Sequence, residues 1–389
     1  MKVAIIGAGA AGCFCAINMK QKHPDAVVEV FEAGTRALAK VAITGGGRCN
    51  LTNSFAGIKN LKEAYPRGEK LMKRMFCVFD HKATMEWFEK HGVRLVTQED
   101  NCVFPASQEA MQIVHTLLYL MEKEGVKLHL SHKCTDIGEY LSKYDKVVVT
   151  TGGSPKMTGL SFLNGLDLEI ATPIPSLFTF NIKDPITKMM GAVVEGVCVK
   201  LAGTKFKSSG PLLITHWGMS GPAILKLSSH AARYLAENEY KATLLVNWLG
   251  ENYNEESALN LIHDIIERNR QKQISSVHPE GLTSRMWSYI IDKCGIPSDK
   301  KLAEIGKKQL NILAATLTND SYQIDGQSRF KEEFVTCGGV ALSNIDLNTL
   351  EAKKYPGLYF AGEVLDVDAI TGGFNLQAAW SMAYVIANT

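Results

Sequence analysis

The first thirty-two residues alternate between short apolar runs and a stretch of helical spacing. Residues 2–7 (KVAIIG) form a short β-branched run, residues 10–22 place apolar side chains around helical turns, and residues 27–32 (VVEVFE) alternate apolar and polar positions. Such patterns predict a buried strand, a helix and a second strand. The chain is therefore expected to begin with a βαβ unit.

Helical spacing continues over residues 68–91 and 106–125, and the second stretch ends at Gly125. A glycine directly after the last periodic residue is a common helix stop. Two strand-like apolar runs follow at residues 126–131 and 146–153. These elements extend the opening unit into an α/β domain.

The pattern changes after Pro173 and Pro175. Residues 176–250 contain short alternating runs, which predict a small antiparallel sheet or barrel. Residues 251–308 are polar and helix-forming, and residues 309–325 return to strand-like character. This middle part of the chain reads as a separate folding unit.

Buried-strand patterns resume at residues 334–340 and 357–363, and an apolar helix is expected over residues 374–387. An inserted domain that interrupts a discontinuous first domain explains this order. The predicted boundaries are 1–173 and 332–389 for the first domain and 174–331 for the insert, with a β-barrel at about 174–250 and 309–331 and a helical subdomain at about 251–308.

Charge and cysteine usage narrow the class of partner. The 389 residues carry 42 Lys and Arg against 40 Asp and Glu, a net charge of +2, and no run of five like charges occurs. A nucleic-acid arm or an anionic-membrane patch is therefore not expected, and the expected partner is a small molecule. The nine cysteines form no CxxC pair and no zinc-ligand spacing, so no metal site is predicted. The sequence leaves the oligomeric state open.

The N-terminus superficially resembles a secretory signal, because a lysine precedes an apolar run. Gly7, Gly9 and Gly12 would break the helix of such a signal, and a strand pattern follows. No other stretch is long and uncharged enough to span a bilayer. A cytoplasmic protein without a membrane anchor is the expectation.

The first candidate site is the strand-to-helix turn Gly7-Ala8-Gly9-Ala10-Ala11-Gly12, a GxGxxG motif. Gly7 would make the tight turn, Gly9 would admit a pyrophosphate, and Gly12 would let helix and strand touch. Glu32, twenty residues beyond Gly12, would accept hydrogen bonds from ribose hydroxyls. FAD and NAD share this fingerprint, so the motif alone does not choose between them.

Two later glycine-rich segments favour FAD, because its ribityl chain and isoalloxazine ring must be held by distant parts of a chain. They are KVAITGGGRCNLTN at residues 40–53 and GLYFAGEVLDVDAITGGFNLQAAW near the C-terminus. Together with GAGAAG, THWGMSGPAIL and FVTCGGV, in the same order, these motifs resemble the BaiN-like, aminoacetone-oxidase family of FAD-binding flavoproteins. The resemblance covers nearly the whole chain.

The resemblance implies an FAD domain of the two-dinucleotide-binding type, a Rossmann-like domain interrupted by a β-barrel and a helical subdomain. In this reading the triple glycine lets bare backbone run beside the cofactor, although a plain glycine-rich surface loop is the alternative. Cys49 is either a redox-capable thiol or a small buried side chain. Glu363 would meet the ribityl hydroxyls, and the helix after Gly373 would stabilise negative charge on the flavin.

The complete set of residues expected to contact FAD comes from seven stretches of the chain. It comprises Gly7, Gly9, Ala10, Ala11, Gly12, Glu32, Ala33, Lys40, Thr44, Gly45, Gly46, Gly47, Arg48, Cys49, Asn50, Cys134, Thr151, Gly152, Gly362, Glu363, Gly372, Gly373, Phe374, Asn375 and Gln377.

The predicted function is an FAD-dependent oxidoreductase acting on a small molecule, with NAD(P)H as a transient co-substrate or with oxygen. No catalytic acid or base is assigned. Two alternatives stay open: a flavoprotein that modifies a macromolecule such as tRNA, and a non-enzymatic flavin-binding redox sensor. Asn101 stands where the family commonly has an arginine before VFP, so no specific amine substrate is carried over.

Overall fold

The computed structural model describes residues 1–154, 156–327 and 335–389 and divides the chain into two compact units. Unit 1 comprises Met1–Pro175 and Val335–Thr389, and unit 2 comprises Ser176–Phe334. The boundary predicted between residues 331 and 332 lies outside the described residues. Each unit has its own hydrophobic core.

Unit 1 is built on a parallel sheet of five strands in the order β16-β7-β1-β2-β6. Strands β1 and β2 pair in register from Lys2 with Val27 to Ile6 with Phe31. The strands are β1 Lys2–Ile6, β2 Val27–Phe31, β6 Lys127–His129, β7 Lys146–Val149 and β16 Leu358–Phe360. The Rossmann-type α/β class predicted from the sequence is confirmed.

Two smaller sheets accompany this layer, one antiparallel in the order β3-β5-β4 and one that pairs β15 with β8. Their strands are β3 Thr52–Asn53, β4 Leu95–Thr97, β5 Cys102–Pro105, β8 Ile170–Ser176 and β15 Val335–Val340. The α-helices of the unit are α1 Ala10–Lys22, α2 Ala39–Ile43, α3 Leu61–Ala64, α4 Glu69–Phe76, α5 His81–Lys90, α6 Ala110–Lys123, α7 Ile137–Leu141 and α13 Phe374–Ala387.

The stretch expected to be one helix over residues 68–91 is two helices, α4 and α5. Asp80 causes the break, because its carboxylate accepts a hydrogen bond from the Ala83 amide at 2.9 Å and caps a new helix. The helix expected over 106–125 is present as α6, and Gly125 follows it with a φ of +73°.

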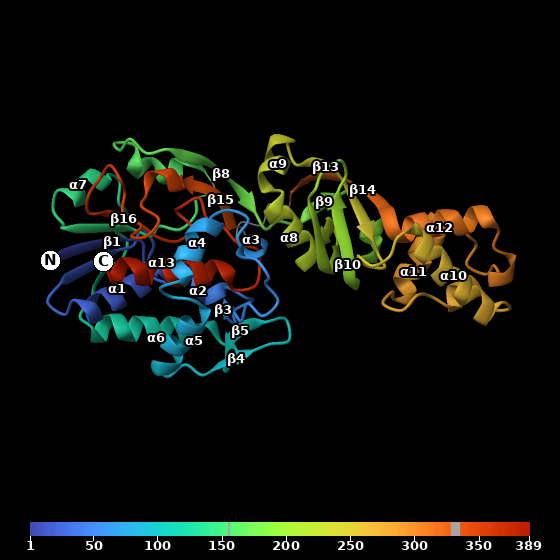
Figure 1. Cartoon of the computed structure of the whole chain (residues 1–389), viewed down its shortest axis with the longest axis horizontal. Helices are drawn as coiled ribbons and strands as arrows, with labels where there is room; N and C mark the ends of the chain where they lie inside the picture. Colours follow the sequence, from blue (N-terminus) through green and yellow to red (C-terminus); the bar gives the residue numbers. More distant parts are fainter. Residues whose placement is uncertain (155, 328–334) are drawn as a thin grey trace. The chain divides into compact units, whose positions relative to one another are not determined.

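Helix α13 joins the C-terminal segment to the N-terminal half of unit 1. It lies beside α1 (Figure 1), and the ring centroids of Phe14 and Trp380 are 5.2 Å apart. The Trp380 indole donates to the Leu51 carbonyl at 3.0 Å, and both aromatic residues are fully buried. This shared core makes one domain from two distant parts of the chain.

Unit 2 contains a closed antiparallel barrel in the order β10-β11-β12-β9-β14-β13. Its strands are β9 Phe180–Ile182, β10 Val193–Leu201, β11 Lys207–Thr215, β12 Gly218–Ser220, β13 Lys241–Asn247 and β14 Asp320–Gln327. Its α-helices are α8 Pro222–His230, α9 Ala232–Glu237, α10 Glu255–Asn269, α11 Ser284–Lys293 and α12 Lys307–Asn319. The closed barrel agrees with the predicted fold class.

The strand-like character expected for residues 309–325 is wrong over its first part, which is helix α12. Leu310, Leu313, Ala314 and Leu317 are buried, and their spacing follows helical turns. The helical subdomain therefore continues to Asn319, and β14 starts at Asp320.

Five 3-10 helices complete the described elements. They are η1 Met157–Leu163, η2 Pro185–Met189, η3 Ile274–Ser276, η4 Leu302–Glu304 and η5 Leu342–Asn344. No helix among the described residues has both the length and the apolar character needed to cross a membrane.

Candidate FAD site

The predicted site residues of unit 1 gather where the parallel strands end. The glycine turn follows β1, Glu32 follows β2, Cys134 lies beyond β6, Thr151 and Gly152 follow β7, and Gly362 and Glu363 follow β16. Carboxyl ends of parallel strands share one edge of a sheet, which is the usual place of nucleotide sites in such folds. The fold thus collects five separate stretches at one edge.

The three glycines of the first turn have different surroundings. A Cβ built on Gly7, whose φ is +109°, would lie 2.6 Å from the Thr150 carbonyl oxygen. A Cβ on Gly12 would lie 1.9 Å from the Gly7 carbonyl oxygen. A Cβ on Gly9 would meet nothing within 4 Å. Gly7 and Gly12 are therefore required by the fold itself, and Gly9 borders open space that suits a pyrophosphate.

Glu32 is held in place by backbone amides. Its carboxylate accepts from the Ala8 amide at 2.8 Å and from the Gly34 amide at 2.7 Å. Each carboxylate oxygen has a further lone pair, so the side chain can still accept ribose hydroxyls. Ala33, the neighbouring predicted residue, is exposed, and Ala10 is half-buried while Ala11 is buried.

Glu363 lies next to the start of α1. Its carboxylate accepts from the Thr336 amide at 2.6 Å, and its second oxygen is 3.9 Å from the Lys40 ammonium. A Cβ on Gly362 would lie 3.4 Å from the Ala11 Cβ. The structure therefore brings Lys40 and the Gly362-Glu363 pair to the glycine turn.

Gly153 and Thr336 also lie beside Glu363, but neither belongs to the set of FAD contacts predicted from the sequence. A Cβ built on Gly153 would lie 2.6 Å from both the Glu363 carboxylate and the Thr336 hydroxyl. Both residues lie in motifs that are visible in the sequence, since Gly153 completes the TTGG run and Thr336 belongs to FVTCGGV. Their contact with Glu363 depends on the pairing of distant segments and appears only in the structure.

The triple glycine has a conformational cause. Gly45, Gly46 and Gly47 have φ values of +60°, +68° and +81°, a left-handed run that other residues rarely adopt. Nothing lies within 4 Å of a Cβ built on Gly46 or Gly47. The loop after Thr44 therefore presents uncovered backbone, as a segment that runs along a cofactor requires.

The two residues after this loop differ in exposure. The exposed Arg48 donates to the Gly45 carbonyl at 3.3 Å, and its guanidinium carbon lies 4.4 Å from the centroid of the Phe104 ring. Cys49 is fully buried, and burial raises the pKa of its thiol to about 12. A thiol with this pKa is protonated at neutral pH, which favours the packing role over a redox role.

Asn50 connects the loop to the start of α13. Its amide nitrogen donates to the Thr52 carbonyl at 2.9 Å, and its amide oxygen accepts from the Gly373 amide at 3.2 Å. Gly372 and Gly373 have φ values of +124° and +88°, and the first turn of α13 contains no acidic residue and no side-chain cap. Apart from the Gly373 amide, which Asn50 occupies, the positive end of this helix meets no acidic side chain in its first turn and can face an anionic group.

Three predicted contacts at α13 are engaged by the protein itself. The Asn375 amide exchanges two hydrogen bonds with Ala369, at 2.9 Å and 3.1 Å. The fully buried Gln377 amide accepts from Thr52 at 2.5 Å and donates to Ser381 at 2.9 Å. Phe374 is buried. These side chains hold the helix in place, so direct hydrogen bonds from Asn375 and Gln377 to the flavin are not what the structure indicates.

A buried ion pair lies next to the segment that Asn375 binds. Arg67 donates through two guanidinium nitrogens to the Asp368 carboxylate, which is completely buried. Asp368 adjoins Ala369, the partner of Asn375. No local sequence pattern indicates this pair, because Arg67 and Asp368 are about three hundred residues apart. Cys134 is also buried, and burial raises the pKa of its thiol to about 11.

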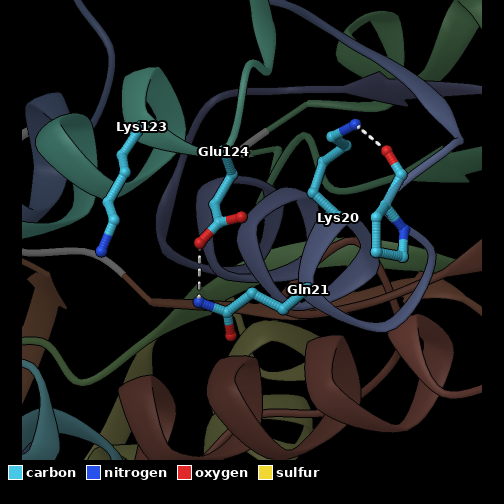
Figure 2. A pocket seen from close by; sticks show the side chains of 5 residues that line it. Lys20, Gln21, Lys123 and Glu124 are labelled. Atoms are coloured by element: carbon cyan, nitrogen blue, oxygen red, sulfur yellow. Dashed lines mark hydrogen bonds between the residues drawn. The ribbon is translucent and has the colours of Figure 1, made fainter.

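Two surface hollows of unit 1 lie away from this edge. One, of about 300 Å³, is lined by Lys20, Gln21, Pro24, Lys123 and Glu124 (Figure 2). It adjoins the last turn of α1, roughly 15 Å from the glycine turn at a rise of about 1.5 Å per residue. The other, of about 460 Å³, lies between α5 and α6. Neither hollow is the predicted cofactor site.

The chain is similar to known proteins over nearly its whole length. The model of the family described as "HI0933-like protein Rossmann domain" matches residues 1–389. The "Ribosomal RNA dihydrouridine synthase" of Escherichia coli (strain K12) is 28% identical over 407 residues, covering 98% of this chain and 96% of that protein. The "3-dehydro-bile acid delta(4,6)-reductase" of Clostridium scindens is 25% identical and covers 99% and 97%.

Among solved structures, the 3-ketosteroid delta1-dehydrogenase from Sterolibacterium denitrificans matches with a TM-score of 0.47 and 10% identity, over 99% of this chain and 98% of that one. The family match extends over every described site residue. The chain therefore belongs to the HI0933-like Rossmann-domain family of FAD-dependent oxidoreductases.

Proposed function

We propose that the protein is an FAD-dependent reductase that adds two hydrogens across a carbon–carbon double bond conjugated to a carbonyl, and that its substrate is a uridine base in ribosomal RNA. The names of the relatives support this choice. Two of them, 28% identical over 98% of this chain, are called ribosomal RNA dihydrouridine synthases. Dihydrouridine is uridine whose conjugated ring double bond is saturated.

The proposed chemistry is also consistent with the relative named as a bile acid reductase. Reduction of a conjugated double bond in a 3-oxo ring and in a uracil ring follows one scheme. A hydride adds to the carbon β to the carbonyl, and a proton adds to the α carbon. The two electrons come from a nicotinamide donor, NADH or NADPH.

The residues at the sheet edge fit FAD. Gly9 leaves room for the pyrophosphate, the Glu32 carboxylate can accept the ribose hydroxyls, and the left-handed backbone at Gly46 is uncovered. When bound, FAD would carry the two electrons from the nicotinamide donor to the double bond. The single observation that carries the assignment is that the glycine turn, Glu32 and the Gly362-Glu363 pair all follow strands of one parallel sheet, at the same end of that sheet.

The chain's own residues supply binding and electrostatics. The first turn of α13 contains no acidic residue, so the positive end of this helix would stabilise negative charge on a flavin bound before it. Burial raises the pKa of the Cys49 thiol, so no redox role beside the flavin is assigned to it. The sequence contains one GxGxxG fingerprint, so NAD(P)H is expected to bind transiently and not in a second nucleotide domain.

The test is anaerobic. The holoprotein is mixed with NADH or NADPH while the flavin absorbance is followed, and ribosomal RNA lacking dihydrouridine is then added. We expect reoxidation of the flavin and a mass gain of two hydrogens in a uridine-containing fragment. A flavin that no nicotinamide reduces, or a reduced flavin that leaves RNA unchanged, contradicts the proposal.

A second candidate substrate is a small molecule with a conjugated enone, as the sequence analysis predicts for the substrate class. The 25% identical bile acid reductase favours it. A 3-oxo steroid with conjugated double bonds is therefore the comparison substrate in the same assay. Reduction of the steroid without any change in RNA would favour this candidate.

A further inference from the structure

Six exposed cations of unit 2 lie in two short segments at one end of its helical subdomain. Two short segments, residues 268–273 and 299–308, carry seven Lys and Arg but only two carboxylates, Asp299 and Glu304. Their net charge of +5 exceeds the +2 of the whole chain, so the remaining residues are net negative. Six of the seven cations are exposed, and we call them the basic cluster: Arg268, Arg270, Lys272, Lys301, Lys307 and Lys308.

Backbone hydrogen bonds hold the two segments together. The Ile274 amide donates to the Lys300 carbonyl at 2.9 Å, and the Leu302 amide donates to the Lys272 carbonyl at 3.0 Å. The Ala303 amide donates to the Arg270 carbonyl at 3.1 Å. Cations that are about thirty positions apart in the sequence therefore become neighbours on one surface.

This surface lies at the end of the subdomain that is turned away from the barrel (Figure 1). Helix α12 begins at Lys307 and runs thirteen residues to Asn319, where barrel strand β14 follows. At a rise of about 1.5 Å per residue, the cluster is roughly 20 Å from the barrel. The basic cluster is therefore not part of the barrel surface.

Ion pairs within the protein do not account for these charges. In the part of the chain that the structure describes, no cation of the basic cluster forms an ion pair. Arg268 and Arg270 at the end of α10 suit the negative end of that helix. Lys307 and Lys308 occupy the first turn of α12, where the helix dipole disfavours cations and no acidic residue offsets them.

We propose that the basic cluster is an RNA-binding surface that contacts phosphates of the substrate. This inference rests on the proposed action on ribosomal RNA, and it assigns the anchoring contact to the helical subdomain. Lysine and arginine side chains that neutralise phosphates release condensed counterions, so the binding they support weakens steeply with salt. Phosphate contacts of this kind position an RNA without reading its bases.

The test uses the full-length holoprotein and a short synthetic RNA hairpin with uridines in its loop. The triple variant Lys301→Gln, Lys307→Gln, Lys308→Gln removes three charges of the cluster. Its matched control, Lys188→Gln, Lys200→Gln, Lys205→Gln, removes three exposed charges elsewhere in unit 2. Affinity is measured by fluorescence anisotropy at several salt concentrations.

We expect the cluster variant to bind on the order of tenfold more weakly or worse, with a slope of log affinity against log salt that is smaller by about two to three. The control should keep both values. The melting temperature of the cluster variant should stay the same or rise, because two cations leave a helix N-terminus. A purely structural role would lower the melting temperature instead.

The outcomes separate this inference from the proposed function. The cluster variant could form dihydrouridine at the wild-type rate and bind RNA with unchanged affinity. That result would overturn the RNA-binding role of the basic cluster and leave the proposed function intact. Cluster-dependent RNA binding without any dihydrouridine supports the surface and contradicts the function. Polyglutamate that binds the cluster more tightly than the hairpin overturns the choice of RNA as the occupant.

Discussion

Replacing Gly9 with alanine should separate cofactor binding from folding. A Cβ at this position meets no protein atom within 4 Å, and Gly9 has the extended backbone of a helix N-cap, with φ −83° and ψ −167°. Alanine is a poorer N-cap than glycine, so the expected loss in the free energy of unfolding is at most about 1 kcal/mol. The added methyl group should therefore weaken binding of a pyrophosphate in the open space without unfolding the protein.

The cost to FAD can be estimated from the hydrogen bonds that the first turn of α1 offers a pyrophosphate. A hydrogen bond to a charged group contributes about 1.5–3 kcal/mol. A methyl group that displaces the phosphates from two such amides costs about 3–6 kcal/mol, which is on the order of a hundredfold to ten-thousandfold in the dissociation constant.

Gly12→Ala is the matched comparison, because its Cβ would lie 1.9 Å from the Gly7 carbonyl oxygen. This variant should lose stability even without FAD. Apoproteins of both variants are unfolded with urea and then titrated with FAD while flavin fluorescence is followed. A Gly9→Ala protein that binds FAD as tightly as wild type would refute the placement of the pyrophosphate. So would a Gly9→Ala apoprotein as unstable as Gly12→Ala.

Three further changes test other parts of the structure. Asn50→Ala removes the link to the Gly373 amide and should weaken FAD binding about tenfold in a fluorescence titration, with unchanged affinity counting against the link. Cys49→Ser should leave turnover within about tenfold, and a larger loss with FAD still bound would show a redox thiol. Because the pKa of Cys49 is raised in the folded protein, its contribution to the free energy of unfolding is unchanged below about pH 9 and decreases toward pH 12. The decrease from this thiol is about 1.4 kcal/mol at pH 10. Urea unfolding should therefore show that Cys49→Ser loses less stability than wild type between pH 9 and pH 10. Lys293→Met leaves the buried Asp320 carboxylate without its ammonium partner, so calorimetry should show a free energy of unfolding that is lower by about 3 kcal/mol. The exposed Lys241→Met is the control, and an equally small change in both variants would contradict the role of the pair.

The local elements of unit 1 follow from short-range patterns in the sequence. Residues 2–6, 10–22 and 27–31 form the predicted βαβ unit, because a buried strand and a helix each have their own spacing of apolar side chains. The need for glycine at Gly7 and Gly45 was also readable, since backbone conformation is a local property.

Errors arose where a local pattern had two readings. Residues 309–319 carry enough β-branched and apolar side chains to suggest a strand, yet their burial against other elements of unit 2 selects a helix. Over residues 68–91 the helical spacing was correct, but the capping hydrogen bond of Asp80 divides the stretch. In both cases a contact outside the spacing pattern decided the outcome.

The site shows the same division. Glu363 was predicted from its motif, but its contacts with Thr336 and Lys40 depend on strand ends that only the folded sheet brings together. Gln377 was expected to face the flavin, whereas packing of α13 turns its amide toward Thr52. Sequence identifies which polar groups exist, and tertiary packing decides which of them are already satisfied.

Charge is the property on which the tertiary structure adds most. Read along the chain, no run of five like charges exists, and the net charge is only +2. The backbone hydrogen bonds between residues 268–274 and 300–303 place two modest basic segments on one surface. Electrostatic potential depends on distance in space and not on separation in sequence, so the sequence determined how many cations the protein has, and only the fold determined where they act together.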